Sequence, residues 1–204
     1  MNYSALFKRL VAIALMFPGA LVAQDWLCRA SLDQSKEVQQ WLVAAYGAPV
    51  RLMPLETHAF QLGAPIETLQ PSQVTGAAID SSQSWRLRPE LPFVYSDSEG
   101  VPALSLAVDS FVYVIDKRYS LFQVVAIGSD GLVLNAFWLR EALFVVLFAD
   151  WAPGKGTIAA TYATCYDLKA MVTETYRPAA THPLKPLFWK SYATTLHTSH
   201  KGGA

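Results

Sequence analysis

Charged side chains are scarce in this chain. Of its 204 residues only 16% are Asp, Glu, Lys or Arg, and the 16 acidic and 16 basic residues cancel to a formal net charge of zero. A chain without a strong field of one sign does not gather nucleic acid or another polyanion by bulk electrostatics, so we expect no nucleic-acid partner. At the same time 52% of the residues are hydrophobic, which excludes intrinsic disorder as the main state.

The motifs of common active sites are missing as well. There is no Gly-x-Ser-x-Gly elbow and no His-Glu-x-x-His zinc motif. Residues 153–157 suggest a phosphate loop, but that motif needs a glycine where Ala149 stands and a Ser or Thr directly after Lys155. Acidic residues such as Asp116 and Asp130 lie mostly at expected turns and form no evident acid–base pair. The sequence therefore predicts no catalytic residues and no cofactor.

Histidine is also rare, with four in the chain. Glu56 and His58 are two residues apart and could pair a carboxylate with an imidazole, although a surface loop is the simpler interpretation. His197 and His200 have a helix-like spacing that could hold a metal weakly, but they lie in a polar tail. We predict no metal site, and a non-enzyme is the favoured interpretation.

The first 23 residues have the pattern of a secretory signal peptide. Lys8 and Arg9 precede an apolar run over residues 10–17, which Pro18 then ends. We expect cleavage after Ala23, which leaves 204 − 23 = 181 residues and 14 − 16 = −2 formal charges. The apolar run is shorter than the roughly 20 residues of a transmembrane helix, so no membrane span is expected after cleavage. An uncleaved N-terminal anchor is the alternative.

Cysteine is nearly absent too, and its two occurrences carry information. Cys28 and Cys165 are 165 − 28 = 137 residues apart. In a protein exported to an oxidising compartment, a single pair of cysteines is a disulfide candidate. The sequence therefore predicts a bridge between the mature N-terminus and a late strand, with two unpaired buried thiols as the alternative.

A helix is expected over residues 32–46. Ser31 and Gln34 have the spacing of a capping box, with Ser31 as N-cap. Apolar residues then recur at helical spacing, and Gly47 is a suitable residue to end the helix. The members of this apolar stripe are Val38, Trp41, Leu42, Ala45 and Tyr46. Its most direct use is to pack the helix on the main core.

The remaining elements are expected to be irregular at first and then β. Prolines and glycines interrupt residues 50–92, which we interpret as a linker. Strands are expected within 93–134, including a hairpin whose turn is Asp130-Gly131, and again at 157–166 and 171–176. Their short connections favour antiparallel pairing. Residues 135–151 stay open between strands and a buried helix that Asn135 would cap.

One segment resembles a known family. Its β pattern includes Val94-Tyr95, an acidic turn ending at Gly100, the run 109–114, Phe122-Gln-Val124 and Gly131-Leu-Val133. In these features residues 93–134 resemble a bacterial SH3-like domain. The resemblance implies a small β fold that binds cell-wall material or a protein and does not catalyse a reaction.

Aromatic residues are abundant, with six Trp, nine Tyr and ten Phe. Exposed aromatic side chains often anchor interfaces. Trp85, Trp151, Phe188 and Trp189 are the binding candidates, because they stand beside Pro, Gly or charged residues or in the C-terminal tail. Core packing is the alternative for each of them.

Together these features predict a mainly β (α+β) protein, an antiparallel sheet or small barrel with one N-terminal amphipathic helix. The expected division is a signal peptide (1–23), a helix with an irregular linker (24–92), an antiparallel β domain (93–176) and a Pro/aromatic tail (177–204). The expected function is non-catalytic binding of another envelope protein in the periplasm, as an assembly factor, inhibitor or immunity-type protein. The alternatives are an envelope hydrolase or small-ligand carrier, or an accessory of a pilus or secretion machine.

Overall fold

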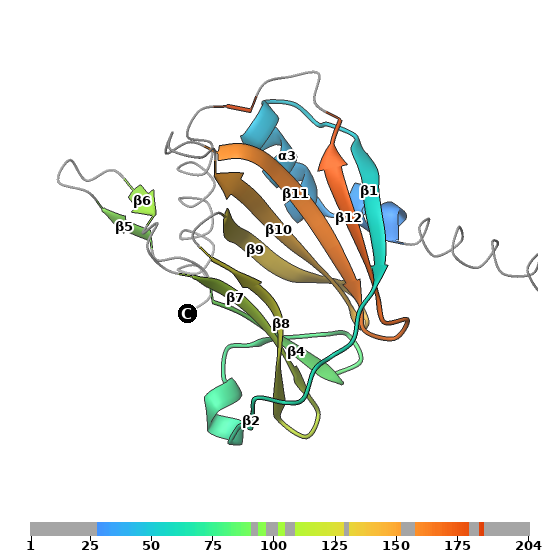
Figure 1. The fold of residues 1–204 in the computed structure, drawn as a ribbon, viewed down its shortest axis with the longest axis vertical. Coiled ribbons are helices and arrows are strands. Elements are labelled where there is room, and N and C mark those ends of the chain that lie inside the picture. The colour runs from blue at the N-terminus through green and yellow to red at the C-terminus, as the bar shows by residue number, and fades with distance from the viewer. Residues whose placement is uncertain are drawn as a thin grey trace, which may run out of the picture.

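Two antiparallel sheets and one helix make up most of the described structure (Figure 1). This computed structural model describes residues 28–90, 94–96, 102–104, 109–128, 131–151, 158–179 and 184–185. The expected mainly β fold with an N-terminal helix is confirmed. The signal peptide and most of the C-terminal tail lie outside the described residues, so those two predictions stay predictions.

The first sheet has the strand order β1–β12–β11–β10–β9. These strands span Leu52–Ala59 (β1), Val172–Pro178 (β12), Ile158–Asp167 (β11), Leu143–Trp151 (β10) and Gly131–Arg140 (β9). The second sheet has the order β2–β8–β7–β4–β3. Its strands span Glu67–Thr68 (β2), Ser120–Ile127 (β8), Ser110–Asp116 (β7), Trp85–Glu90 (β4) and Ala78–Ile79 (β3). A separate two-stranded ladder joins β5 (Val94–Ser96) to β6 (Pro102–Leu104).

The α-helix α3 spans Lys36–Tyr46 and ends as expected at Gly47, whose φ of 81° suits glycine. Its start differs from the prediction. The N-cap is Ser35, whose side-chain oxygen accepts a hydrogen bond from the backbone N–H of Val38 at 3.2 Å. Residues 28–34 are already helical, so Ser31 lies inside that preceding segment and does not begin α3.

The main core lies between α3 and the first sheet. Figure 1 shows α3 behind this sheet, and Trp41 and Leu42 of the helix are fully buried against it. From the sheet side, alternate residues of β10 point to the helix: Leu143, Val145, Leu147 and Ala149. The helical stripe identified in the sequence therefore has the expected role in the core.

A second core fills the space between the two sheets. It contains the other residues of β10, Phe144 and Val146, packed with Leu87 and Val112 of the second sheet. Because β10 is buried on both faces, its apolar run lacks the alternation that marks a half-exposed strand. The open question over residues 135–151 is thereby resolved in favour of two strands, β9 and β10, with their turn at residues 141–142.

Residues 50–92 are not the irregular linker that the prolines suggested. They form β1, β2, the short 3₁₀ helix η1 (Pro71–Val74), β3 and β4. The strand β1 tolerates Pro54 because it is an edge strand with a bulge beside that proline. Its partner is β12, more than 100 residues away, so no local pattern could reveal the pairing.

The expected hairpin around Asp130-Gly131 is wrong. The two strands on either side belong to different sheets: β8 pairs with β7 and β2, whereas β9 pairs with β10. The chain therefore crosses from the second sheet to the first at this point. The described strands of segment 93–134 are accordingly divided among three ladders, and its SH3-like resemblance stays a prediction.

Candidate functional site

The predicted disulfide between Cys28 and Cys165 is confirmed. Both residues are buried, at 5% and 2% exposure. The bond attaches the helical segment 28–34 to β11 and places it beside the main core. A protein disulfide of this kind suggests a non-cytoplasmic, oxidising compartment. In the part of the chain that the structure describes, no helix is long and apolar enough to cross a membrane.

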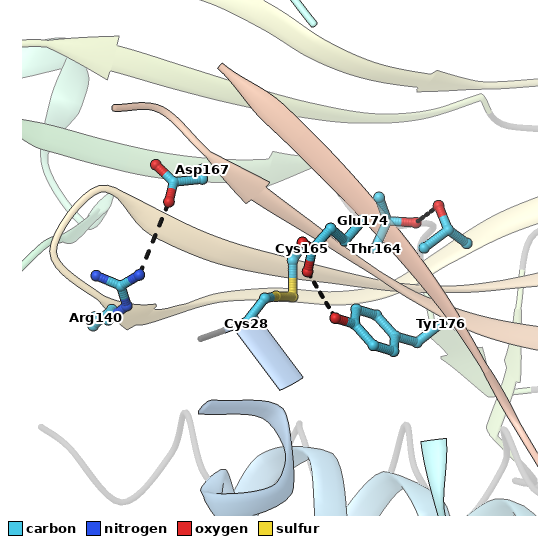
Figure 2. The surroundings of a disulfide bond; sticks show 8 residues. Cys28, Arg140, Thr164, Cys165, Asp167, Glu174 and Tyr176 are labelled. Carbon is cyan, nitrogen blue, oxygen red and sulfur yellow. Dashed lines mark hydrogen bonds and ion pairs between the residues drawn. A yellow bond between two sulfur atoms is a disulfide. The ribbon is translucent and has the colours of Figure 1, made fainter. Parts of the chain in front are cut away.

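A small hollow with room for about one water molecule lies against this disulfide. Figure 2 shows the polar groups around it. Glu174 stands directly across the strand pair from Cys165, and its Oε2 accepts a hydrogen bond from the Tyr176 hydroxyl at 2.7 Å. Arg140 and Asp167 approach to 3.9 Å at the rim. The hollow has a carboxylate, but the sulfur atoms beside it are bonded to each other and supply no thiolate nucleophile.

Three aspartates stabilise turns through hydrogen bonds with the backbone. In each of Asp80, Asp116 and Asp167 the oxygen Oδ1 accepts hydrogen bonds from two backbone N–H groups that follow it in the chain. This pattern fixes a turn without glycine by satisfying its backbone donors. The expectation that acidic residues serve turns is therefore confirmed at Asp116.

Asp80 also joins the two sheets. Its Oδ2 accepts hydrogen bonds from the Ser82 hydroxyl and from the backbone N–H of Ala142, in the β9–β10 turn. Burial raises the pKa of this carboxyl, but its hydrogen bonds from Trp85, Ser82, Ala142 and Ser84 together outweigh burial and hold the pKa below the ordinary 3.8. Asp80 is thus a buried carboxylate that hydrogen-bond donors stabilise, and its role is to hold the two sheets together.

The predicted binding residues are not brought together. Trp85 is partly buried between the sheets and contacts Phe122 with ring centroids 6.5 Å apart, which is the core-packing alternative. The backbone of Trp151 ends β10, while its side chain lies outside the described structure, as do Phe188 and Trp189. The pair Glu56 and His58 meets at 3.1 Å on β1, exposed on a strand and not in a loop.

A different surface combines aromatic and cationic side chains. We define the Arg–aromatic face as Arg86, Arg88, Phe111, Tyr113 and Tyr119, on the side of the second sheet that faces away from the first. Register places Arg88 beside Tyr113 and Arg86 beside the buried Ile115. All five side chains of the face are partly exposed, and Tyr113 and Tyr119 also pack against a small third core on the same side, formed by Leu69, Val74, Ile115 and Leu121.

The turn between β7 and β8 positions one end of this face. The Tyr119 ring lies 5.3 Å from the Arg86 guanidinium carbon, a cation–π contact. Tyr119 has φ of 65°, a left-handed conformation that is uncommon for a bulky residue. Asp116 holds this turn through hydrogen bonds from Arg118 and Ser120. The turn thereby holds the Tyr119 ring beside Arg86.

At the other end, Arg88 forms an ion pair with Glu90 at 3.0 Å, with both side chains about two-fifths exposed. Burial raises the pKa of the neighbouring Tyr113 above 10. The negative charge of Glu90 raises this pKa further, and the positive charge of Arg88 lowers it, so the phenol is neutral at physiological pH. The ring of Phe111 stands 6.0 Å from that of Tyr113. The face thus offers two guanidinium groups among aromatic rings.

Sequence reasoning missed this surface because it treated residues 85–90 as irregular. The signal was the alternation Trp85-Arg-Leu-Arg-Pro-Glu90, in which the odd positions turn inward and the arginines turn outward. Among the described residues, no group of three His, Cys, Asp or Glu side chains could hold a metal ion. In comparisons with known proteins, no family model, curated protein or solved structure matches the chain.

Proposed function

We propose that this protein works in the periplasm as a non-catalytic component that binds another envelope protein. The observation that carries the proposal is the Arg–aromatic face. Arginine and aromatic residues are the types enriched at protein interfaces, because they give a large contact area with polar groups at defined positions. Arg86 is held against Tyr119, so part of its ordering cost is met before binding.

The disulfide supports the compartment in this proposal. A bridge that closes a loop of 137 residues is useful only where oxidation is maintained, and the periplasm meets that condition. The predicted signal peptide gives the route to it. Fractionation of cells and the mass of the exported protein test this part, and a mature chain that starts after Ala23 is expected.

Site-specific photocrosslinking in intact envelopes tests the binding itself. A photoreactive phenylalanine analogue replaces Tyr113 on the Arg–aromatic face or, as the control, Tyr162 on the first sheet. We expect one discrete protein adduct from position 113 and none from position 162. Equal adducts from both positions, or none from 113 while an established envelope complex crosslinks in the same cells, would contradict the proposal.

A further inference from the structure

The spacing of the two arginines restricts what can bind the Arg–aromatic face. Arg86 and Arg88 are two residues apart on β4 and point to the same side, so their Cα atoms are about 6.5–7 Å apart. Side chains of an extended peptide that point to one side repeat at the same distance. Two acidic residues separated by one residue would therefore meet both guanidinium groups at once.

The donors of both arginines suit such a partner. Arg86 contacts Tyr119 through a cation–π interaction at 5.3 Å, which does not depend on a directed N–H bond, so its N–H donors can bind a carboxylate. Arg88 uses one terminal nitrogen on Glu90, and a guanidinium has five N–H donors in all. A second carboxylate can therefore bind Arg88 without breaking that ion pair.

The charges around the Arg–aromatic face differ between its two ends. Lys117 and Arg118 are exposed in the β7–β8 turn, at the Arg86 end of the face. Asp116 also stands at this end, and Glu67 on β2 lies in the same cross-strand row as Arg86, three strands away, whereas Glu90 lies at the opposite end of β4. Cations still outnumber carboxylates at the Arg86 end, and Glu90 marks the end where an acidic chain would be repelled.

We propose that the Arg–aromatic face binds an extended acidic segment of its partner protein, with acidic residues at alternate positions. This inference rests on the proposed function and specifies its partner. A peptide matches the two-residue repeat of the arginines along β4, whereas a sulfated glycan or an anionic membrane needs positive charge without this register. The aromatic rings of Phe111 and Tyr113 lie alongside and contact the apolar parts of the segment.

Fluorescence anisotropy with the mature protein and labelled eight-residue peptides tests the inference. The probe alternates glutamate and serine, and the control peptide alternates glutamine and serine. At about 50 mM salt, where exposed charges are weakly screened, we expect binding of the acidic peptide only. Equal binding of both peptides, or no binding of the acidic one, overturns the inference. It leaves the photocrosslinking test of the proposed function intact, because that test does not depend on partner charge.

Matched variants locate the site. The double variant Arg86→Gln, Arg88→Gln should bind the acidic peptide about tenfold more weakly, since two charge-assisted contacts are lost. Lys169→Gln with Arg177→Gln removes two exposed cations elsewhere and is the control, with an expected change of less than about twofold. An equal loss in both double variants would mean that only overall charge matters, and would overturn the assignment.

A gain of affinity is the sharpest readout, because structural damage does not produce one. Glu90→Gln removes the carboxylate that repels the peptide, so about two- to threefold tighter binding is expected. Weaker binding by this variant contradicts the proposal that Glu90 repels the acidic segment. Dextran sulfate and phosphatidylglycerol vesicles are run in parallel. If either binds in an Arg86- and Arg88-dependent way and the peptide does not, the partner is a glycan or a membrane and the inference fails.

Discussion

Replacing Asp80 by asparagine tests how the two sheets are joined. The Asp80 carboxylate is 2% exposed and its four hydrogen-bond donors come from Ser82, Ser84, Trp85 and Ala142. In Asp80→Asn one oxygen becomes an amide NH₂. If the remaining oxygen keeps the two N–H groups of Ser84 and Trp85, the new NH₂ faces the N–H of Ala142, donor against donor. That backbone group is then buried without an acceptor.

The size of the effect follows from that single loss. A buried donor without a partner costs about 1–3 kcal/mol, and hydrogen bonds to a charged acceptor are stronger than those to a neutral one. We therefore expect Asp80→Asn to lower the free energy of unfolding by about 2–3 kcal/mol at pH 7. For a chain of this length the melting temperature should fall by roughly 5–10 °C.

The effect should depend on pH with a defined sign. Because the pKa of folded Asp80 lies below its unfolded value, its carboxylate stabilises the fold above about pH 4. That contribution is lost as the pH falls through the folded-state pKa. Urea unfolding at pH 7 and at pH 3 should therefore show the difference between wild type and Asp80→Asn shrinking in acid.

Asp116→Asn is the matched control for this experiment. At Asp116 both backbone donors, from Arg118 and Ser120, bind the same oxygen, Oδ1, which asparagine retains. A loss below about 0.5 kcal/mol is expected, as for other surface substitutions. If Asp80→Asn is no more destabilising than Asp116→Asn, the reasoning that Asp80 connects the sheets is refuted.

Three further predictions concern stability. Replacing both Cys28 and Cys165 by serine should lower the free energy of unfolding by roughly 4–5 kcal/mol, the value that the chain-entropy model gives for a loop of this length. Urea unfolding measures the change, and a free energy equal to that of the oxidised wild type would contradict a structural bridge. Gly47→Ala should cost about 1 kcal/mol, because an L side chain is strained at its φ of 81°, while the flexible end of the Lys185 side chain, 2.8 Å from the added Cβ, can move aside; a thermal melt unchanged from wild type would speak against this. Burial raises the pKa of Tyr166 to about 12, so an ultraviolet titration should include a phenol that ionises near pH 12, after the unperturbed tyrosines. The stability that this group contributes should be complete below pH 10 and decline as the pH rises toward 12; completion of the whole phenol titration near pH 10 would disprove it.

Local patterns predicted some elements well and others poorly. The apolar stripe ending at Gly47 identified α3, because helical spacing and a glycine cap are properties of neighbouring residues. The start of α3 was misplaced at Ser31 because two serines offered similar caps. In the folded chain residues 28–34 form a helical segment of their own, and Ser35 caps α3. The strand β10 was ambiguous because both of its faces are buried.

Pairing between distant strands decided the rest. Glycine and proline counts suggested a linker at 50–92, but β1 is stabilised by β12 and β4 by β7, partners that local sequence does not specify. The Asp130-Gly131 pair is typical of a hairpin turn, yet β8 and β9 belong to different sheets and β9 pairs with β10. A turn signal acts over a few residues, while the choice of sheet depends on the whole core.

Local sequence was enough to predict the helix, most late strands and the disulfide, since each depends on spacing along the chain or on the presence of just two cysteines. Strand order and packing between layers, by contrast, place Trp85 between the sheets and Arg86 over Tyr119. The alternation along a strand predicts which of its side chains share one face of the sheet. It does not predict which face is exposed to solvent or which residues of other strands lie beside it. Those depend on the strand order and on the packing of segments that are far apart in the sequence.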